Sequence, residues 1–516
     1  MKRSASWNRL IRLFSAAGLF VFLAVPVFSQ SLEIEVNDLT RRRFSELDFD
    51  QLSYPVPRKD ELTEGISLLE AAPLTAEAYR VEITTRRHGT ETLTGDLGGS
   101  LHRWYLFREG GEWTLETRGT PADSAGGEPG VYTGVTKISV AGELLEADTL
   151  TVWISWEGTD LLKTEIARFA DLTGMEIEVL EVPGIQSKLT SVARGGGDLP
   201  DLVMVQSDYL PELIGGRIIQ RLDYIPAGHL LDKGNYAFSR DGGRWALPFY
   251  FDTQLVFSRP DITGPLPEDR WTLDEFESIL EKILRSGVAP ITWNAYSAYW
   301  LIPFQIAFGK ERLLEPDGRI VIDDEPTRKA LEYLVSLMDR GLLDVREREG
   351  MISRFVEGDV AMILTGSYSI PSFEKLGLDF AVHPYPYTTR TGNPVSPLLD
   401  FKGWAMTRKT KNPVLARRLM EYLTGVGAQY RFTEAVFKLP ANREAWTVGE
   451  TANPYFADLK ASFEAGTVIP PNDVYPIFKN TMWKLLRFVF SGQMSIDAVL
   501  EQGQAIIDKK FQRRKR

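Results

Sequence analysis

Residues 150–179 decide the fold, and they read LTVWISWEGTDLLKTEIARFADLTGMEIEV. The stretch opens with an apolar run that is typical of a buried strand. Its middle places Leu162, Ile166 and Phe169 at helical spacing, and Gly174 ends the predicted helix. The last five residues alternate apolar and polar side chains, which indicates a second strand. A strand, a helix and a strand in this order predict a β-α-β unit and therefore a parallel sheet.

The alternation of predicted strands and helices continues after residue 179. Residues 202–205 predict another apolar strand, and Thr272 with Glu275 forms a capping box ahead of an amphipathic helix. From residue 149 onward the sequence therefore predicts an α/β fold. This part of the chain is too long for one hydrophobic core, so we expect two lobes.

Residues 30–147 have a different texture. Short β-prone runs are separated by glycine pairs at 98–99, 110–111 and 126–127, and no amphipathic helix stands out. This pattern predicts a small β-rich domain that precedes the α/β part. Its residues offer no recognisable site, so its role is unknown.

Residues 1–29 have the pattern of a secretory signal peptide. They contain four cations and no acid, and an apolar run at 13–28 leads to small residues near Ser29. The run is short for a membrane span, so we expect cleavage and export. The chain has no cysteine, which excludes a lipid anchor on an N-terminal cysteine. We therefore expect a periplasmic protein that is not lipid-anchored.

Composition and charge exclude several other classes. The chain is 43% hydrophobic and 25% charged, as globular proteins are. Its net charge of −11, which becomes −15 without the four cations of residues 1–29, makes it a poor nucleic-acid binder. The absence of cysteine excludes thiol nucleophiles and Cys–zinc sites, and the four histidines lack metal-ligand spacing. The glycine-rich phosphate-binding motifs and the G-x-S-x-G motif are missing as well. We expect no enzyme activity, no metal and no cofactor.

One long stretch, residues 286–309, carries no charged side chain. It is long enough to cross a bilayer, but Pro290 and Pro303 interrupt it, which favours a buried or cleft-lining segment. Trp293 and Tyr296 lie three residues apart within it, at helical spacing. Such spacing is compatible with core packing and with a ring-lined site, and both interpretations stay open.

Rings and acids follow the predicted strands. Trp156 and Glu157 come after the first strand, Asp208 after the strand at 202–205, and Tyr250 and Asp252 after an apolar segment. Ligands of parallel sheets bind beyond the carboxyl ends of the strands, so we expect these side chains to share a site. Flat rings cover the apolar faces of a pyranose, and carboxylates accept hydrogen bonds from its hydroxyl groups. The pattern therefore favours a neutral sugar.

A series of short motifs runs in order through residues 149–510. Together with the signal peptide, they make this part of the chain resemble the family 1 extracellular solute-binding proteins, the maltose-binding-protein-like receptors of ABC importers. The resemblance does not cover residues 30–147. The motifs are GDLPDL (197–202), ALPFYFDT (246–253), WTLDEF (271–276), FVEGDVAM (355–362), GSY (366–368), WAM (404–406), KNP (411–413) and LPAN (439–442).

The resemblance implies a bilobal periplasmic-binding-protein fold over residues 148–516. Lobe 1 is expected at 148–250 and 400–445, and lobe 2 at 255–395 and 446–516. Family members hold a sugar or oligosaccharide in the cleft between two hinged lobes and deliver it to the permease subunits of an ABC transporter. A monomer that binds no nucleic acid is expected.

The resemblance also assigns roles to single residues. Glu157 and Asp208 look like sugar hydrogen-bonding residues of lobe 1, Asp252 like a hinge-side carboxylate, and Tyr368 like a stacking ring of lobe 2. Val205 stands where several sugar binders have an aromatic residue, which puts maltose itself in doubt. The full set of candidate ligand-binding residues is Trp156, Glu157, Asp208, Tyr250, Asp252, Trp293, Tyr296, Tyr368, Trp404 and Tyr475.

Two other functions remain open at this point. A secreted glycoside hydrolase would use two acids, for example Glu157 with Asp252. A ligand-binding sensor would report to a chemoreceptor or kinase instead of a permease.

Overall fold

The computed structural model describes most of the chain from residue 31 onward. The predicted signal peptide, residues 1–29, lies outside the described residues. Those are 31–36, 40–44, 49, 53–58, 61–71, 75–94, 104–117, 130–144, 149–225, 227–267, 271–389, 391–469 and 471–515.

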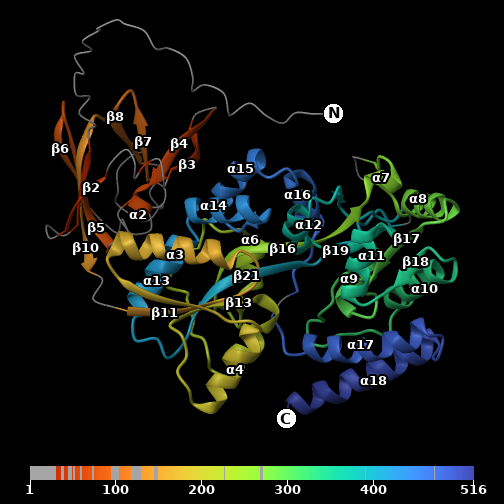
Figure 1. The fold of residues 1–516 in the computed structure, drawn as a ribbon. Coiled ribbons are helices and arrows are strands. Elements are labelled where there is room, and N and C mark those ends of the chain that lie inside the picture. Colours follow the sequence, from red (N-terminus) through yellow and green to blue (C-terminus); the bar gives the residue numbers. More distant parts are fainter. Residues whose placement is uncertain are drawn as a thin grey trace, which may run out of the picture.

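The N-terminal part forms two five-stranded sheets that face each other (Figure 1). Trp104 and Trp113 of one sheet and Ile83 and Ile138 of the other are buried in one core, as in a β-sandwich. The first sheet has the order β2-β1-β10-β5-β6, with β1 (Leu32–Val36), β2 (Thr40–Phe44), β5 (Thr75–Thr85), β6 (Gly89–Thr94) and β10 (Val135–Leu144). The second has the order β3-β4-β7-β8-β9, with β3 (Tyr54–Arg58), β4 (Glu61–Ser67), β7 (Trp104–Glu109), β8 (Glu112–Thr117) and β9 (Val131–Thr133).

The sandwich is docked on lobe 1 through a buried ion-pair network. Arg431 of α14 (Val426–Val436) donates to both carboxylate oxygens of Glu165, at 2.9 Å each, and to Glu70 of the sandwich at 3.3 Å. Gly427 of the same helix sits so close to the sandwich that a Cβ atom would lie 2.4 Å from the ring of Tyr54. The contact between the sandwich and lobe 1 therefore combines buried ion pairs with close packing of α14 against a ring.

Lobe 1 confirms the predicted β-α-β unit. β12 (Glu176–Glu181) and β13 (Leu202–Gln206) both pair in parallel with β11 (Thr149–Ile154). The crossover helix α3 (Thr159–Thr173) buries Leu162, Ile166 and Phe169, and Gly174 ends it in the left-handed region, with a φ of 70°. The helical periodicity of these apolar residues thus decides which face packs on the sheet.

Two long strands connect the lobes. β16 (Leu247–Ser258) pairs with β21 (Leu399–Met406) along its first half, while residues 254–258 pair with β19 (Val360–Gly366) of lobe 2. Every residue of β16 is buried. One strand therefore belongs to both lobes, and the sheet continues without a break in the order β12-β11-β13-β21-β16-β19-β17-β18.

Lobe 2 is built on three parallel strands, β19, β17 (Ala289–Trp293) and β18 (Leu343–Val345). The uncharged stretch forms β17 and the buried helix α9 (Ala298–Ala307). The capping box of Thr272 and Glu275 is present at the start of α8 (Leu273–Arg285). Among the described residues, no helix combines the length and the apolar character that crossing a membrane requires.

The C-terminal helices divide into two groups (Figure 1). α15 (Arg443–Ala452) and α16 (Phe456–Ala465) cover the connecting strands: the rings of Trp446 and Phe463 lie 5.9 and 4.9 Å from that of Phe251. α17 (Tyr475–Phe490) and α18 (Ile496–Lys515) pack on lobe 2. The core of lobe 2 thus includes residues of both α17 and α18.

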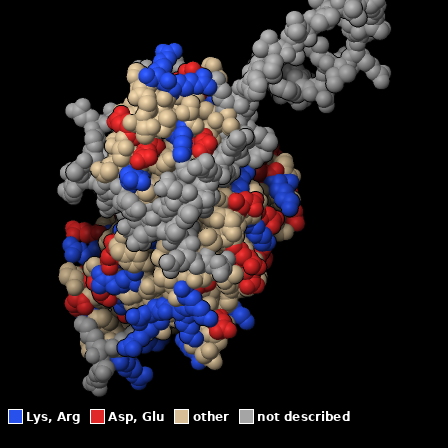
Figure 2. Space-filling view, turned by 90° about the vertical axis from the view of Figure 1, so that its left-hand side faces the viewer, with Lys and Arg blue, Asp and Glu red and all other residues tan. Residues whose placement is uncertain are grey.

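A view from the sandwich side shows how charge is distributed on this end of the molecule. In Figure 2, acidic and basic side chains are interspersed, and basic side chains gather on the lower part of the visible face. The visible face thus carries both kinds of charge, although the chain as a whole is acidic, with a net charge of −11.

The burial of His383 in β20 (Ala381–His383) predicts how the stability of the protein depends on pH. Burial lowers the pKa of His383 to about 4 from its usual value near 6.5, and its Nε2 lies 3.0 Å from the hydroxyl of Ser258. Between about pH 6.5 and 4, the unfolded chain binds a proton there that the native protein does not bind, so stability falls as the pH falls through this window. We expect His383→Gln to remove up to about 3 kcal/mol of that loss.

The measurement is the urea denaturation midpoint between pH 4 and pH 7. His88→Gln, at an exposed turn of the sandwich, serves as the control. Identical pH slopes for the wild type and the His383 variant would contradict the prediction.

Candidate functional site

The site is centred on Asp252, in the middle of the connecting strand β16. Asp252 stands opposite Asp400 of β21, and Tyr250 stands opposite Lys402. Cross-strand partners project from the same face of a sheet, as do residues two apart on one strand. These four side chains therefore form one polar cluster on one face of the two paired strands.

Two buried lysines hold Asp252, which is only 1% exposed. The Nζ of Lys402 lies 3.3 Å from its Oδ2, Lys438 donates to its Oδ1, and the hydroxyl of Ser367 donates at 2.8 Å. Burial by itself would raise the pKa of Asp252, but the two ammonium groups and these hydrogen bonds outweigh burial and lower it. Asp252 is therefore a fixed carboxylate.

The pKa of a second carboxylate, that of the partly buried Asp400, is shifted in the opposite direction. Burial raises its pKa, and Asp208 adds to this effect, although Lys402 donates to Asp400 at 2.6 Å. Gln206, at the end of β13, donates to the same oxygen at 2.8 Å. Asp400 and Asp252 together outweigh burial at Lys402 and raise its pKa, so this lysine stays charged.

The loop after β11 brings Trp156 and Glu157 to the cluster. Trp156 has a φ of 71°, and its ring lies 5.8 Å from Nζ of Lys402. Glu157 Oε2 lies 3.7 Å from Nζ of Lys438. Gly158 has a φ of 74°, and a Cβ atom there would lie 2.6 Å from the ring of Phe432 on α14. The loop therefore needs glycine at this position, where it packs against α14 beside the site.

Two ion pairs join lobe 1 to the N-terminal end of α17. Lys479 donates to Asp208 at 2.8 Å, and Arg240 donates to Asp473 at 2.6 Å. Asp208 outweighs burial at Lys479 and raises its pKa. A groove of about 700 Å³ opens between the lobes here, and its walls include Asp208 and Tyr209 on one side and Asp473 and Lys479 on the other.

Lobe 2 and α17 add rings around the same cluster. Burial raises the pKa of Tyr299 strongly, and Asp400, Tyr368 and Tyr385 interact with its hydroxyl group. Tyr368 lies two residues after the end of β19. Tyr475 of α17 is buried as well, and its ring lies 5.1 Å from Nζ of Lys479. Both lobes thus supply rings and charged groups to one region.

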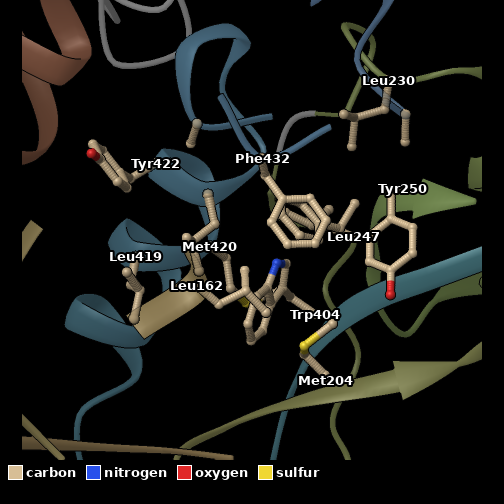
Figure 3. Packing of buried hydrophobic residues seen from close by; sticks show 14 of the residues in the cluster. Leu162, Met204, Leu230, Leu247, Tyr250, Trp404, Leu419, Met420, Tyr422 and Phe432 are labelled. Atoms are coloured by element: carbon tan, nitrogen blue, oxygen red, sulfur yellow. The ribbon is translucent and has the colours of Figure 1, made fainter. Parts of the chain in front are cut away.

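The structure brings most of the candidate residues together. Glu157, Tyr250 and Asp252 meet around Lys438, whose Nζ lies 5.9 Å from the centre of the Tyr250 ring. In Figure 3, the hydroxyl of Tyr250 points away from Phe432 and toward β21. The candidates gathered at the interlobe region are Trp156, Glu157, Asp208, Tyr250, Asp252, Tyr368 and Tyr475.

Three candidates lie elsewhere. Trp404 is 0% exposed and packs against Phe249 within the lobe 1 core (Figure 3). Trp293 is also 0% exposed, and its ring stacks on Phe304 within lobe 2. Both indole rings pack within the core of a single lobe, whereas Tyr250, which is equally buried, lies beside Lys438 and Asp252. A role of the two tryptophans in ligand binding stays a prediction. Tyr296 lies at a partly exposed edge of lobe 2, beside Arg487.

Sequence reasoning missed the lysines of the site. The alternation Asp400-Phe401-Lys402 within an apolar strand, and Lys438 between Phe437 and Leu439, are the signals that could have revealed them. A charged residue surrounded by apolar neighbours is expected to be buried with a partner. The other residues missed are Tyr299, Tyr385 and Lys479.

The site combines paired carboxylates and lysines with rings. Its carboxylates are held by ammonium groups, and the described part of the chain contains no cluster of residues that could hold a metal ion. The lowered pKa of Asp252 makes this carboxyl a poor proton donor at neutral pH, so in the hydrolase pair with Glu157 it would have to be the ionised partner. Both of its oxygens are already engaged by Lys402, Lys438 and Ser367, which disfavours attack on a sugar.

The buried ion pairs predict a large cost for Lys438→Met. This change leaves the carboxylate of Asp252 buried with one cation fewer, so we expect a loss of about 3–5 kcal/mol, measured by urea denaturation. In the double variant with Asp252→Asn, the loss should be smaller than the sum of the two single losses.

Lys163→Met is the matched control, because Lys163 forms a surface ion pair with Glu181 at 2.9 Å. It should cost less than about 1 kcal/mol. Equal losses of stability for Lys438→Met and Lys163→Met would show that the buried ion pair of Lys438 stabilises the protein no more than a surface ion pair does.

Comparisons with known proteins agree with this geometry. The family model of the bacterial extracellular solute-binding proteins matches residues 165–457, more than half of the chain. The maltodextrin-binding protein MdxE of Bacillus subtilis is 24% identical over 332 residues, which cover 61% of this chain and 78% of that protein. The maltotriose-binding protein of Pyrococcus abyssi is 24% identical over 224 residues, which cover 42% of this chain and 48% of that protein. These names describe binding proteins, in agreement with the prediction that the chain is not an enzyme.

Solved structures show the same fold. The GacH receptor of Streptomyces glaucescens superposes with a TM-score of 0.63 at 18% identity, covering 70% of this chain and 98% of the receptor. The maltotriose-binding protein of Thermus thermophilus superposes with a TM-score of 0.62 at 22% identity, covering 70% of this chain and all of that protein. The expected bilobal α/β fold is therefore confirmed, and the chain belongs to the family of bacterial extracellular solute-binding proteins.

Proposed function

We propose that this protein captures a neutral oligosaccharide between its two lobes and delivers it to the permease of an ABC transporter. The observation that carries the proposal is the composition of the interlobe site. Lobe 1 contributes Trp156, Glu157 and Asp208, lobe 2 and α17 contribute Tyr368 and Tyr475, and Asp252 lies on the strand shared by both lobes. The relatives named for maltodextrin and maltotriose support a sugar as the ligand.

The charges of the site favour a neutral ligand. Lys402 and Lys438 are 4% and 1% exposed, and carboxylates of the site surround both. Lys479 is paired with Asp208. These three lysines thus present no unbalanced positive charge to an anionic ligand. Oxygen acceptors, ammonium donors and flat rings together suit a polyol with apolar ring faces.

Closure is proposed to occur about the connecting strands. A ligand that contacts both lobes favours the closed conformation by its additional contacts in that state. The ion pairs Lys479–Asp208 and Arg240–Asp473, which join lobe 1 to the N-terminal end of α17, support a closed state of this kind. The closed protein would then dock on the permease. A sensor that reports to a chemoreceptor would use the same binding site and differ only in its membrane partner.

Export and anchoring complete the proposal. The signal-peptide pattern of residues 1–29 supports secretion into the periplasm, and the absence of cysteine supports a form without a lipid anchor. We take the working form to be a monomer, because one chain supplies both walls of the site.

The first test is thermal unfolding in the presence of sugars. A ligand at 100 times its Kd should stabilise the protein by about 2.7 kcal/mol and raise its Tm. The screen covers glucose, maltose, maltotriose, maltoheptaose and galactose-containing oligosaccharides, and small-angle scattering follows compaction. No Tm shift and no compaction with any of these sugars would reject an oligosaccharide ligand.

The second test is Tyr368→Ala. Loss of this ring should weaken binding of a sugar found in the screen by about 10-fold in isothermal titration calorimetry, because a stacked ring contributes roughly 1 kcal/mol beyond its buried area. Tyr236→Ala, at a 53% exposed position on α6 (Asp232–Ala237), is the control. Equal affinities of the two variants would remove Tyr368 from the site.

A further inference from the structure

Helix α17 carries a regular row of rings and cations. Tyr475, Lys479, Trp483 and Arg487 follow one another at intervals of four residues. Residues four apart in a helix are surface neighbours, so the row runs along one side over about 18 Å. The row begins in the interlobe site, where Lys479 contacts Asp208, and leads away from it along lobe 2 (Figure 1).

The outer half of this row meets the edge of the lobe 2 sheet. The parallel strands β19, β17 and β18 end on the same edge, and Tyr368, Tyr296 and Glu347 follow them there. In the sheet order, β19 lies next to the connecting strand and β18 lies farthest out. This edge therefore leads outward from the interlobe site, and it is where ligands of parallel sheets bind.

Arg487 joins the helix to this edge. Its guanidinium group lies 4.4 Å from the ring centre of Tyr296 and 4.5 Å from that of Trp483. It also forms an ion pair with Glu347, which accepts a hydrogen bond from Asn294 at 3.2 Å. Two rings from distant parts of the sequence are thus held around one cation.

This surface consists of aromatic rings around a cation whose charge is balanced by a carboxylate. Arg487 is paired with Glu347, so the rings and not a net charge dominate what a ligand meets. Trp483 is 48% exposed, although a ring of this size is normally well buried. A flat ring that is fixed on one face by a guanidinium and open on the other is suited to cover a pyranose.

We infer that Tyr296, Trp483 and Arg487, the outer platform, bind the distal units of a long oligosaccharide whose first units occupy the interlobe site. This inference rests on the proposed function and adds the length of the ligand to it. A short sugar would contact only the interlobe residues. A long one would extend over the lip of lobe 2 and stack on Trp483.

The experiment compares a short and a long probe by isothermal titration calorimetry. Maltose and maltoheptaose are titrated into the wild type, Trp483→Ala, Trp483→Phe and Phe488→Ala. Phe488 is the matched control, because it lies on the same helix and is 40% exposed. We expect Trp483→Ala to weaken maltoheptaose binding by about 3- to 10-fold and to leave maltose binding unchanged. Trp483→Phe should retain most of the affinity, and Phe488→Ala all of it.

The outcomes separate the two proposals. If Trp483→Ala binds both probes as the wild type does, or weakens both equally, the outer platform is overturned while the interlobe site stands. If the wild type binds neither probe nor any other sugar in the thermal screen, the proposed function is overturned and the platform with it. Unchanged Tm values of the variants without ligand show that folding is not the cause of the effect.

Discussion

Burying a carboxylate at the junction of two lobes is costly unless cations accompany it. The rest of this structure depends on the ion pairs that offset this cost at Asp252. Asp252 lies on a strand whose residues are all buried, and two ammonium groups hold it from neighbouring elements. One of them, Lys438, comes from the turn that follows α14, the helix on which the sandwich is docked. The same interaction therefore fixes the binding residues, the connecting strands and the helix that supports the N-terminal domain.

The α/β part of the fold could be predicted because its local signals agree with its packing. The apolar periodicity of residues 150–179 and the capping box at Thr272 produce the elements that they indicate. The course of β16 could not be read in the same way. The sequence of this buried strand does not reveal that its first half pairs with one lobe and its second half with the other, because pairing depends on partners far away in the sequence.

The site was predicted in part for a similar physical reason. Acids that follow strands can be placed at a sheet edge from the sequence, as Glu157 and Asp208 can. Asp252 was also expected after a strand, but it lies within β16, and its shared contact with Lys438 is what brings it beside Glu157. Trp293 and Trp404 are aromatic residues of the kind that bind sugars. The neighbouring sequence does not show whether such an indole ring packs in a core or faces a ligand. Lys402 and Lys438 were missed because a lysine is ordinarily exposed, and only its burial beside Asp252 shows that it belongs to the site.

The docking of the sandwich on lobe 1 has a practical consequence. Arg431 and the close approach at Gly427 join the N-terminal domain and lobe 1 into a single body, so any hinge motion would move lobe 2 relative to a body larger than itself. A fluorophore on the sandwich would then report the same displacement as one on lobe 1, at a greater distance from the ligand. Because the chain contains no cysteine, two engineered thiols, one on the sandwich and one on lobe 2, would be the only labelling sites for an energy-transfer ruler.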